Sequence, residues 1–226
     1  MLYVHCRGPA LEHGQWVRSL DNLVGKAVEP LVVVFIDQEG MTTDHDTYAA
    51  MVVEELIPWA ESAYRLDASA DRRGHVGMGA WSYLAAYTAL RYPGTVAKLG
   101  IPSIYALDLM EQRLEALLSQ NLPPMEVYME WGLYDLRSPD EAWDMRRVNR
   151  RMRDRFAQKG FTVLGGQVSD GAGWSSWKNR TDVLLKSLFP LCSSLDSRLQ
   201  QEGFHSLQTG YIPSYDSEKK PFLIAH

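Results

Sequence analysis

The sequence has few cysteines and no long uninterrupted run of apolar residues. Cys6 and Cys192 are the two cysteines among 226 residues, too few for a disulfide framework, which fits a reducing compartment. A membrane-spanning helix needs about 20 consecutive apolar residues, and no stretch approaches that length. The first residues also lack the basic segment and apolar stretch of a signal peptide. We therefore expect a cytoplasmic protein without a membrane partner, although a strand pattern directly after Met1 is compatible with a longer natural N-terminus.

The sequence also has fewer basic than acidic residues. The 23 Lys and Arg against 28 Asp and Glu give a net charge of -5, which does not favour general nucleic-acid binding. No Cys/His set has metal-ligand spacing, and no Gly-x-Gly-x-x-Gly or phosphate loop follows a strand pattern. We therefore predict no metal and no cofactor. One predicted helix is rich in arginine, which we interpret as a solvated face with nearby acids, the alternative being a surface for an anionic partner. These arginines are Arg146, Arg147, Arg150, Arg151, Arg153 and Arg155.

What the sequence does contain is an alternation of short β-rich runs with amphipathic helical stretches. This order predicts an α/β fold with a doubly wound, mainly parallel sheet that carries helices on both faces. Residues 1–190 form the predicted domain, and residues 191–226 form a tail that is packed over it or partly disordered. The predicted strands are 2–6, 31–36, 73–78, 96–101, 125–131 and 161–168, and the predicted helices are 16–24, 48–65, 82–92, 107–117, 138–159 and 175–188.

Two local signals refine the predicted helices. Ser138-Pro139-Asp140-Glu141 combines a cap residue, a proline at the first helical position and an acid three residues after the cap, so we expect a helix to open there and to end at Gly160. Pro58 lies inside the helix predicted over 48–65 and predicts a kink.

The turn Val76-Gly77-Met78-Gly79-Ala80-Trp81-Ser82 joins a predicted strand to a helix, where active groups of open α/β sheets lie. Together with Leu56-Ile57-Pro58-Trp59 and the helix end Ala89-Leu90-Arg91-Tyr92-Pro93, it resembles the esterase D and enterochelin esterase group of α/β-hydrolases, which includes feruloyl and acetylxylan esterases. The resemblance runs from about residue 2 to residue 190. It implies an α/β-hydrolase-like fold and a Ser-His-Asp carboxylic ester hydrolase. The first predicted strand matches the family's third, so the family's N-terminal edge strands are missing.

The resemblance aligns the nucleophile position with Gly79, the first glycine of Gly-x-Ser-x-Gly with Gly77 and the second with Trp81. Glycine has no side chain that can attack a substrate. A nucleophile elbow holds its central residue in a strained conformation that costs a non-glycine residue about 1–3 kcal/mol and that glycine adopts freely. The alternative is that Ser82 is the nucleophile, but Ser82 has Ala80 and Leu84 where the motif needs glycine and is more simply a helix N-cap.

The resemblance also implies the acid and the base. Gly132-Leu133-Tyr134-Asp135 matches the family's Gly-x-x-Asp, which makes Asp135 the inherited acid; the alternative is a turn aspartate that binds backbone N–H groups. Trp174 and Trp177 match two family tryptophans and place the base position at Ala172, whose methyl group cannot accept a proton. Two of three triad members are therefore absent.

The remaining candidates are a binding loop and the histidines. The segment Cys6-Arg7-Gly8-Pro9 falls where the family has its oxyanion-hole loop, whose backbone N–H groups need no particular side chain. His75 is about 13 Å from the elbow tip at about 3.3 Å per residue, which favours a core or sheet-face histidine, and His205 lies in the predicted tail. The ligand-binding residues that we expect are Cys6, Arg7, Gly8, Ala80 and Trp174.

Three hypotheses follow. The leading one is an esterase-family scaffold that has lost serine-hydrolase activity and acts as a binding or interaction domain, with a small-molecule ligand in the remnant cleft. The second is an active carboxylic ester hydrolase that uses a displaced pair such as Ser82 with His205. The third is a structural accessory domain, whose open sheet edge is covered by a homodimer partner or an upstream domain.

Overall fold

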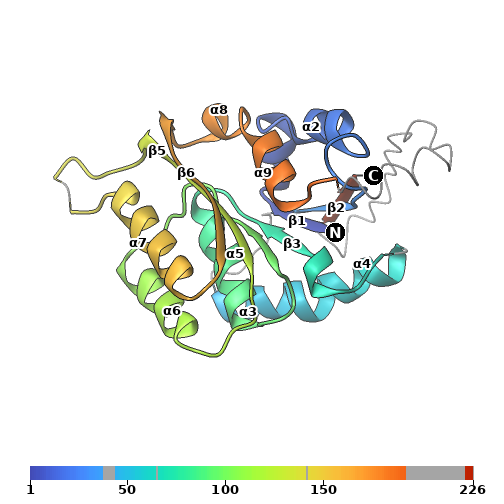
Figure 1. Cartoon of the computed structure of the whole chain (residues 1–226), viewed down its shortest axis with the longest axis horizontal. Coiled ribbons are helices and arrows are strands. Elements are labelled where there is room, and N and C mark those ends of the chain that lie inside the picture. Colours follow the sequence, from blue (N-terminus) through green and yellow to red (C-terminus); the bar gives the residue numbers. More distant parts are fainter. Residues whose placement is uncertain (38–43, 65, 141, 192–221, 226) are drawn as a thin grey trace.

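A computed structural model describes residues 1–37, 44–64, 66–140, 142–191 and, for the backbone alone, 222–225 (Figure 1). Strands and helices alternate along the chain as predicted. The strands are β1 (Leu2–His5), β2 (Val33–Ile36), β3 (Gly74–Val76), β4 (Lys98–Gly100), β5 (Glu126–Tyr134), β6 (Thr162–Gly171) and β7 (Phe222–Ala225). The helices are α1 (Arg7–Glu12), α2 (Trp16–Leu23), α3 (His45–Ala50), the π-helix η1 (Met51–Leu56), α4 (Ile57–Ala63), the short 3₁₀-helix η2 (Ala70–Arg72), α5 (Ala80–Arg91), α6 (Asp108–Leu118), α7 (Met145–Gln158), α8 (Trp174–Trp177) and α9 (Thr181–Leu188).

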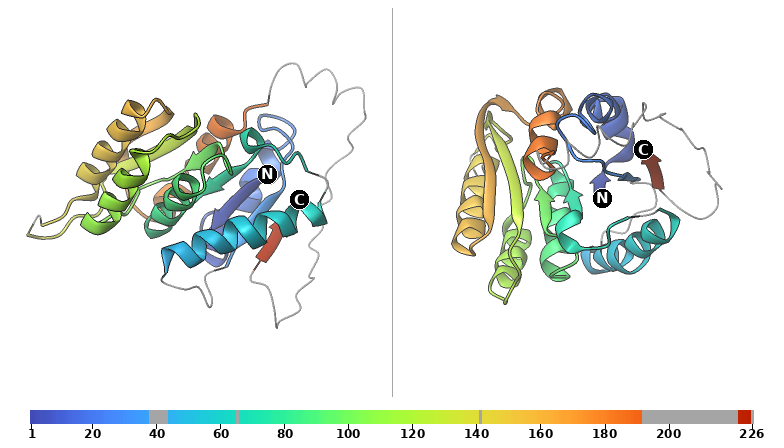
Figure 2. Two further views of the ribbon diagram at one scale, coloured as in Figure 1. Left: turned by 90° about the horizontal axis from the view of Figure 1, so that it is seen from below. Right: turned by 45° about the vertical axis from the view of Figure 1, so that its right-hand side comes forward.

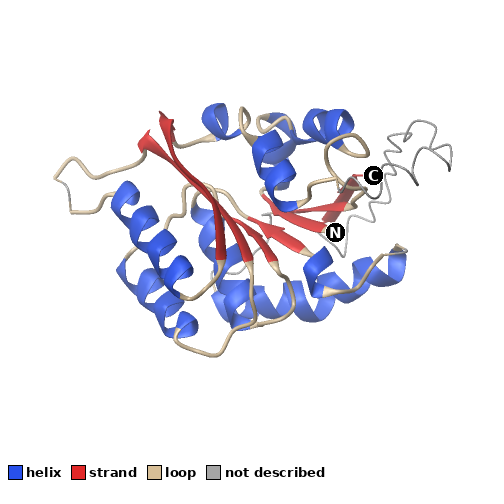
Figure 3. Cartoon of the chain, in the orientation of Figure 1, coloured by secondary structure: helices blue, strands red, loops and turns tan. Residues whose placement is uncertain are grey.

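The strands form one sheet in the order β6-β5-β4-β3-β1-β2-β7, in which β7 is antiparallel and the other pairs are parallel. Helices α3 to α7 cover one face and α1, α2, α8 and α9 cover the other (Figure 3). Every residue of β2 is buried, as expected for a strand between two helical layers. The predicted doubly wound, mainly parallel α/β fold is confirmed.

Strand β7 pairs with the outer edge of β2 at the end of the sheet (Figure 2). The sequence predicted no strand there, because residues 222–225 lie in the segment interpreted as a tail. The resemblance left the outer edge of β2 without a neighbour, and β7 supplies one from the other end of the chain. The division into a domain of residues 1–190 and a tail of residues 191–226 stays a prediction.

The helix predicted to open at Ser138 begins instead at Met145, so that prediction is wrong. The Ser138 hydroxyl accepts from the backbone N–H of Trp143 at 3.1 Å, and the Ser138 N–H donates to the Trp143 carbonyl at 2.9 Å, so Ser138 binds Trp143 and does not cap a helix. Asp144 caps α7 in its place, because its carboxylate accepts from the N–H of Arg146 at 2.9 Å. Gly160 follows α7 with φ of 89°, as predicted for a helix end.

Two other predicted helices are interrupted. The helix over 48–65 contains the π-helix η1 directly before Pro58, where the proline ring and its missing N–H disturb the regular ladder. The helix over 175–188 is broken between Trp177 and Thr181, where Arg180 turns its side chain towards the sheet.

Candidate functional site

The turn between β3 and α5 has the backbone of a sharp elbow. Gly79 lies at its apex with φ of 61° and ψ of -122°, a conformation that L side chains rarely adopt. A Cβ at Gly77 would lie 2.1 Å from the carbonyl oxygen of Trp81, so only glycine allows the strand and helix to approach there. The Gly79 N–H donates to the Pro102 carbonyl at 3.1 Å, and its own carbonyl accepts from the Tyr105 N–H at 3.2 Å. The backbone therefore holds the elbow without any side chain at residue 79.

Trp177 of α8 covers the apex of this elbow. A Cβ built on Gly79 would lie 3.0 Å from Cη2 of the Trp177 ring, which is closer than such contacts normally are. The indole N–H donates to the Ser103 hydroxyl at 3.2 Å, which fixes the ring in this position. The space into which a side chain at residue 79 would project is therefore occupied by an aromatic ring.

Ser82 lies in the first turn of α5, and Gly79 occupies the cap position that we predicted for Ser82. That prediction is wrong, because the helix starts two residues earlier than its apolar pattern indicates. The Ser82 hydroxyl donates to the Gly79 carbonyl and accepts from the Tyr105 N–H at 3.3 Å. The side chain is fully buried. His205, the base in the alternative hypothesis, lies outside the described residues.

Asp135 follows β5 at the carboxyl end of the sheet and is buried. Its Oδ1 accepts from the N–H of Leu136 at 2.7 Å, which is the local turn contact that we gave as the alternative interpretation. Its Oδ2 is buried and has no hydrogen-bond partner among the described residues.

Ala172 follows β6, the strand that pairs with β5. The last pair in register between them is Tyr134 and Gly171, so Asp135 and Ala172 are the next residue on each strand. Ala172 packs against the apolar cluster that contains Trp177 and Met78. Asp135 and Ala172, the residues predicted as acid and base positions, therefore each follow the last registered pair of β5 and β6, and residue 172 has only a methyl side chain.

The expected binding residues lie around the same end of the sheet. Cys6 has φ of 67° and caps α1, and the Ala10 N–H donates to its carbonyl at 2.7 Å, so the segment predicted as a loop is the first turn of a helix. Arg7 forms an ion pair of 2.9 Å with Asp37.

The other three expected residues differ in their surroundings. Gly8 has open space at its Cα, and Ala80 is the first residue of α5. The Trp174 ring is nearly perpendicular to that of Trp177, with centroids 5.5 Å apart.

An ion network around the buried Glu130, which the sequence did not predict, joins β5 and β6 to Arg180 at the start of α9. Arg180 Nε donates to Glu130 at 2.9 Å and its NH1 group donates to Asp170 at 2.8 Å. The Tyr128 hydroxyl binds the second oxygen of Glu130 at 2.5 Å, and the Ser176 hydroxyl binds Asp170 at 2.8 Å. Hydrogen bonds from Arg180 and then Ser176 lower the pKa of Asp170 to about 2. No local pattern could have found this network, because its members come from separate elements.

A second buried cluster joins β1, β3 and α3. His5 and His75 share a contact of 2.7 Å between their Nε2 atoms, and the Tyr48 hydroxyl lies 2.8 Å from Nδ1 of His5. Burial lowers the pKa of His75 to about 3, and burial followed by the neighbouring His75 lowers the pKa of His5. His75 is buried in β3, which agrees with its interpretation as a core or sheet-face histidine, whereas its contact with His5 was not predicted.

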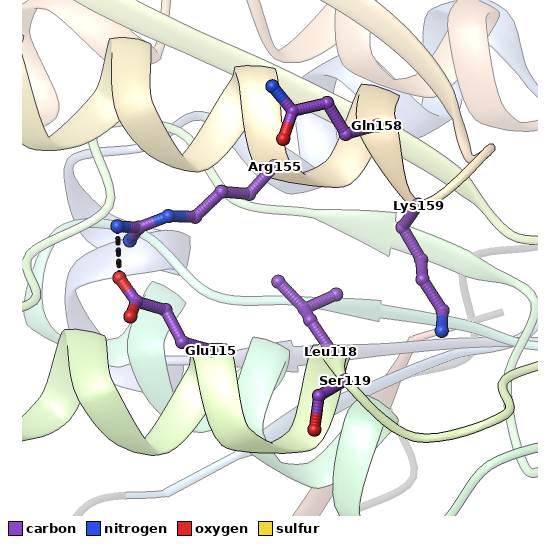
Figure 4. A pocket seen from close by; sticks show the side chains of 6 residues that line it. All are labelled: Glu115, Leu118, Ser119, Arg155, Gln158 and Lys159. Atoms are coloured by element: carbon purple, nitrogen blue, oxygen red, sulfur yellow. Dashed lines mark ion pairs between the residues drawn. The ribbon is translucent and has the colours of Figure 1, made fainter.

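The arginines of α7 are largely engaged within the molecule. Arg146 pairs with Asp144 at 2.6 Å, and Arg151 pairs with Glu111 at 2.7 Å. Arg155 pairs with both Glu111 and Glu115. A cavity of about 360 Å³ lies between the ends of α6 and α7 beside this last pair (Figure 4), and its lining residues are Glu115, Leu118, Ser119, Arg155, Gln158 and Lys159. These pairs support the interpretation of a solvated face with nearby acids, although the acids that pair with Arg151 and Arg155 come from α6.

Within the described ranges, no three His, Cys, Asp or Glu side chains lie close enough together to hold a metal ion. None of the helices that the structure describes is long and apolar enough to cross a membrane.

Comparison with known proteins identifies the fold of the chain through similar solved structures. No family model matches the sequence, and no curated protein matches it. Among solved structures, a ferulic acid esterase is similar with a TM-score of 0.65 and 14% identity over 83% of each chain. An IroE-like serine hydrolase from Shewanella oneidensis gives 0.67 and 12% identity over 83% of this chain and 69% of that one. The enterobactin esterase of Shigella flexneri gives 0.65 and 20% identity, and the match covers 83% of this chain and 52% of that one. The resemblance to esterase-like α/β-hydrolases is thus confirmed at the level of the fold.

Proposed function

We propose that the chain is an esterase-type α/β-hydrolase scaffold without serine-hydrolase activity that acts as a binding or interaction domain. The observation that carries this proposal is the apex of the elbow, where Gly79 has no side chain and the Trp177 ring lies 3.0 Å from the position of a Cβ. Acyl transfer of this type needs a nucleophile and a base that activates it. Losing one of them typically reduces turnover by about 10⁶-fold.

The adjoining positions support the same proposal. Asp135 and Ala172 each follow the last registered pair of β5 and β6, and the methyl group of Ala172 cannot take up a proton. The solved structures of similar fold carry the names of esterases and serine hydrolases. We therefore compare this chain with enzymes whose reaction needs a nucleophile and a base. We interpret Asp135 as the inherited acid of the triad, which no longer has a histidine to orient.

The direct test is an activity measurement on the unmodified protein. We expect no hydrolysis of p-nitrophenyl acetate above the uncatalysed rate and no labelling by a fluorophosphonate. Specific labelling of Ser82 would overturn the proposal in favour of an active ester hydrolase using Ser82 with His205. The buried Ser82 hydroxyl, bonded to the backbone of Gly79 and Tyr105, argues against that alternative.

A constructive test restores the missing groups. Gly79→Ser together with Ala172→His should introduce measurable esterase activity if Trp177 can move by the few tenths of an ångström that a Cβ requires. Gly79→Ala with Ala172→His is the matched control, because it has the same backbone strain and the same histidine but no hydroxyl. Equal activity of the two double variants, with circular dichroism showing intact folds, would contradict the assignment of residue 79 as the nucleophile position.

A cytoplasmic location and a partner at the sheet edge also belong to this proposal. Strand β7 covers the outer edge of β2, whereas β6 has a neighbour on one side only in the sheet that the structure describes. We predicted a homodimer partner or an upstream domain at the edge left by the missing N-terminal strands, and because β7 lies there, such a partner would have to cover the open side of β6 instead. Sedimentation that shows a monomer at all concentrations would remove the homodimer from the proposal.

A further inference from the structure

Strand β6 has an open edge at one end of the sheet. In the sheet that the structure describes, its one neighbour is β5, and β6 lies at the end of the sheet beside α7 (Figure 1 and Figure 2). Gly165, with φ of 83°, divides the strand, and residues 166–170 continue towards its carboxyl end. Natural edge strands are often protected by Lys or Pro, and β6 contains neither. Its outward backbone groups can therefore pair with a further strand.

Three arginines of α7 lie on the side of the helix that faces this edge. Arg146, Arg150 and Arg153 are spaced by four and three residues, which places them on one side of α7. Arg150 donates to Gln167 of β6 at 2.6 Å, and Cζ of Arg153 lies 5.8 Å from the centre of the Trp131 ring in β5. Trp131 and Gln167 are a registered pair. The two guanidinium groups therefore lie over the same level of the last two strands.

The positive charge on this side of α7 is only partly balanced by carboxylates. Helix α7 contains six arginines and one acidic residue. The two arginines on the opposite side pair with carboxylates of α6. On the β6 side, Asp144 and Asp154 pair with Arg146 and Arg153, whereas the side chain that Arg150 contacts in the described part of the chain is a neutral amide. An acidic partner at the edge of β6 would therefore meet positive charge that the chain itself does not fully neutralise.

We infer that the open edge of β6 binds an extended acidic segment of a partner protein, which adds a strand to the sheet. Backbone hydrogen bonds to residues 166–170 provide the pairing, and Arg150 and Arg153 select for carboxylates. Successive side chains of a strand point to opposite faces, so acids at alternate positions of the segment would all lie on the α7 face. This inference rests on the proposed function, because it names the partner class of the interaction domain.

A second copy of this chain is a less favourable occupant of the same edge. Antiparallel pairing of β6 with its counterpart, related by a two-fold axis, would place both α7 helices on the same face of the joined sheet. The Arg150 sides of the two helices would then face each other across the interface, and like charges in such an arrangement repel. The charge on α7 therefore favours an acidic partner over a homodimer.

The test uses the unmodified protein and a fluorescein-labelled peptide of sequence Glu-Val-Glu-Val-Glu-Val-Glu-Val. Fluorescence anisotropy measures its binding at an ionic strength of about 20 mM, where surface charges are weakly screened. We expect binding that N-methylation of two adjacent central peptide residues weakens by about tenfold. The methylated peptide keeps every charge but loses one N–H donor from each edge of its strand. Binding should also slow the hydrogen exchange of backbone N–H groups in residues 166–170.

Substitutions in α7 test the part played by charge. Arg150→Gln should weaken peptide binding by about twofold to fivefold, and Arg150→Glu by about tenfold. Arg151→Gln is the matched control, because it makes the same change one residue along the helix, on the side that faces Glu111 of α6. The control should leave the affinity nearly unchanged.

Three outcomes would overturn the inference. The first is no binding, or equal binding of the methylated peptide, which would mean that no strand is added. The second is equal affinity of Arg150→Glu and Arg151→Gln. The third is equal binding of a single-stranded oligonucleotide of the same charge, the result expected of a general polyanion surface. None of these outcomes bears on hydrolysis, whereas ester turnover by the unmodified protein would refute the loss of hydrolase activity and leave the peptide measurements interpretable.

Discussion

Two polar clusters in the described part of the chain, one around the buried Glu130 and one around the buried His5 and His75, avoid an unpaired buried charge in opposite ways. The network pairs Glu130 and Asp170 with Arg180, whereas burial holds the pKa values of His5 and His75 low and the two rings share one short contact. Buried charge is tolerated only when it is paired and hydrogen-bonded, and otherwise the group gives up its charge. The comparison teaches that the network is sensitive to loss of a partner and the histidine pair is sensitive to protons.

Removing the cation of the network should have the largest effect. Arg180→Met leaves Glu130 charged and buried, with a side chain 3% exposed, and we expect the free energy of unfolding to fall by about 3–5 kcal/mol. Urea unfolding measures this change. Adding Glu130→Gln should recover part of the loss, and Lys186→Met, which breaks a surface pair, should cost about 0.5 kcal/mol or less. A loss from Arg180→Met as small as that control would show that the network is not a coupled unit.

His5 and His75 should make the free energy of unfolding depend on pH. The pH range of this dependence lies well above the range in which Asp170 of the network titrates. The unfolded pKa of histidine is about 6.5, and burial lowers that of His75 to about 3. The stabilisation is complete above pH 6.5 and is lost as pH falls towards 3, by up to about 1.4 kcal/mol per pH unit for each histidine. Asp170, with a pKa of about 2, contributes only below about pH 4.

The measurement is urea unfolding at several pH values between about 7 and 5.5. His75→Gln should flatten the dependence by about 1.3 kcal/mol over that interval, which is one histidine's share. An unchanged slope in His75→Gln would mean that His75 is not held neutral in the folded protein.

A substitution at the elbow should have an intermediate effect. Gly79→Ala introduces a Cβ in a strained backbone conformation and against Trp177, so we expect a loss of about 1–3 kcal/mol in thermal or urea unfolding. Gly94→Ala is the control, since Gly94 has φ of 82° and open space around its Cα, and it should cost about 1 kcal/mol. Equal losses of unfolding free energy in Gly79→Ala and Gly94→Ala would show that the Trp177 ring moves aside without a measurable cost.

The smallest effect should come from removing one of two arginines that pair with the same buried carboxylate. Glu111 is buried like Glu130, but both Arg151 and Arg155 bind it, and Arg151 is half exposed. Arg151→Gln should therefore cost about 1 kcal/mol or less in urea unfolding, because Arg155 keeps the carboxylate paired. A loss as large as that of Arg180→Met would mean that pairing at the surface and pairing inside the sheet are equivalent here.

Features that depend on local pattern were predictable, and features that depend on distant residues were not. The strand-helix order follows from the apolar pattern along the chain, and the elbow at Gly79 and the turn at Asp135 were expected from the resemblance to esterase-like α/β-hydrolases. The start of α7 was misplaced because Ser138 has two competing uses, and the backbone of Trp143 binds it instead of a helical N–H. The Trp177 ring above Gly79 and the contact of His5 with His75 arise only when separate elements meet, so a linear pattern carries no signal for them.

The pairing of β7 with β2 has a consequence for the order in which the chain assembles. Its partners are separated by roughly 190 residues of sequence, one of the longest separations that this chain allows, and contacts of such separation form slowly because closing the intervening loop costs entropy. During synthesis, which proceeds from the N-terminus, β1 and β2 leave the ribosome long before β7. The outer edge of β2 therefore stays without its neighbour until residues 222–225 have been synthesised, and a ribosome that stalls before then would leave that edge open to aggregation.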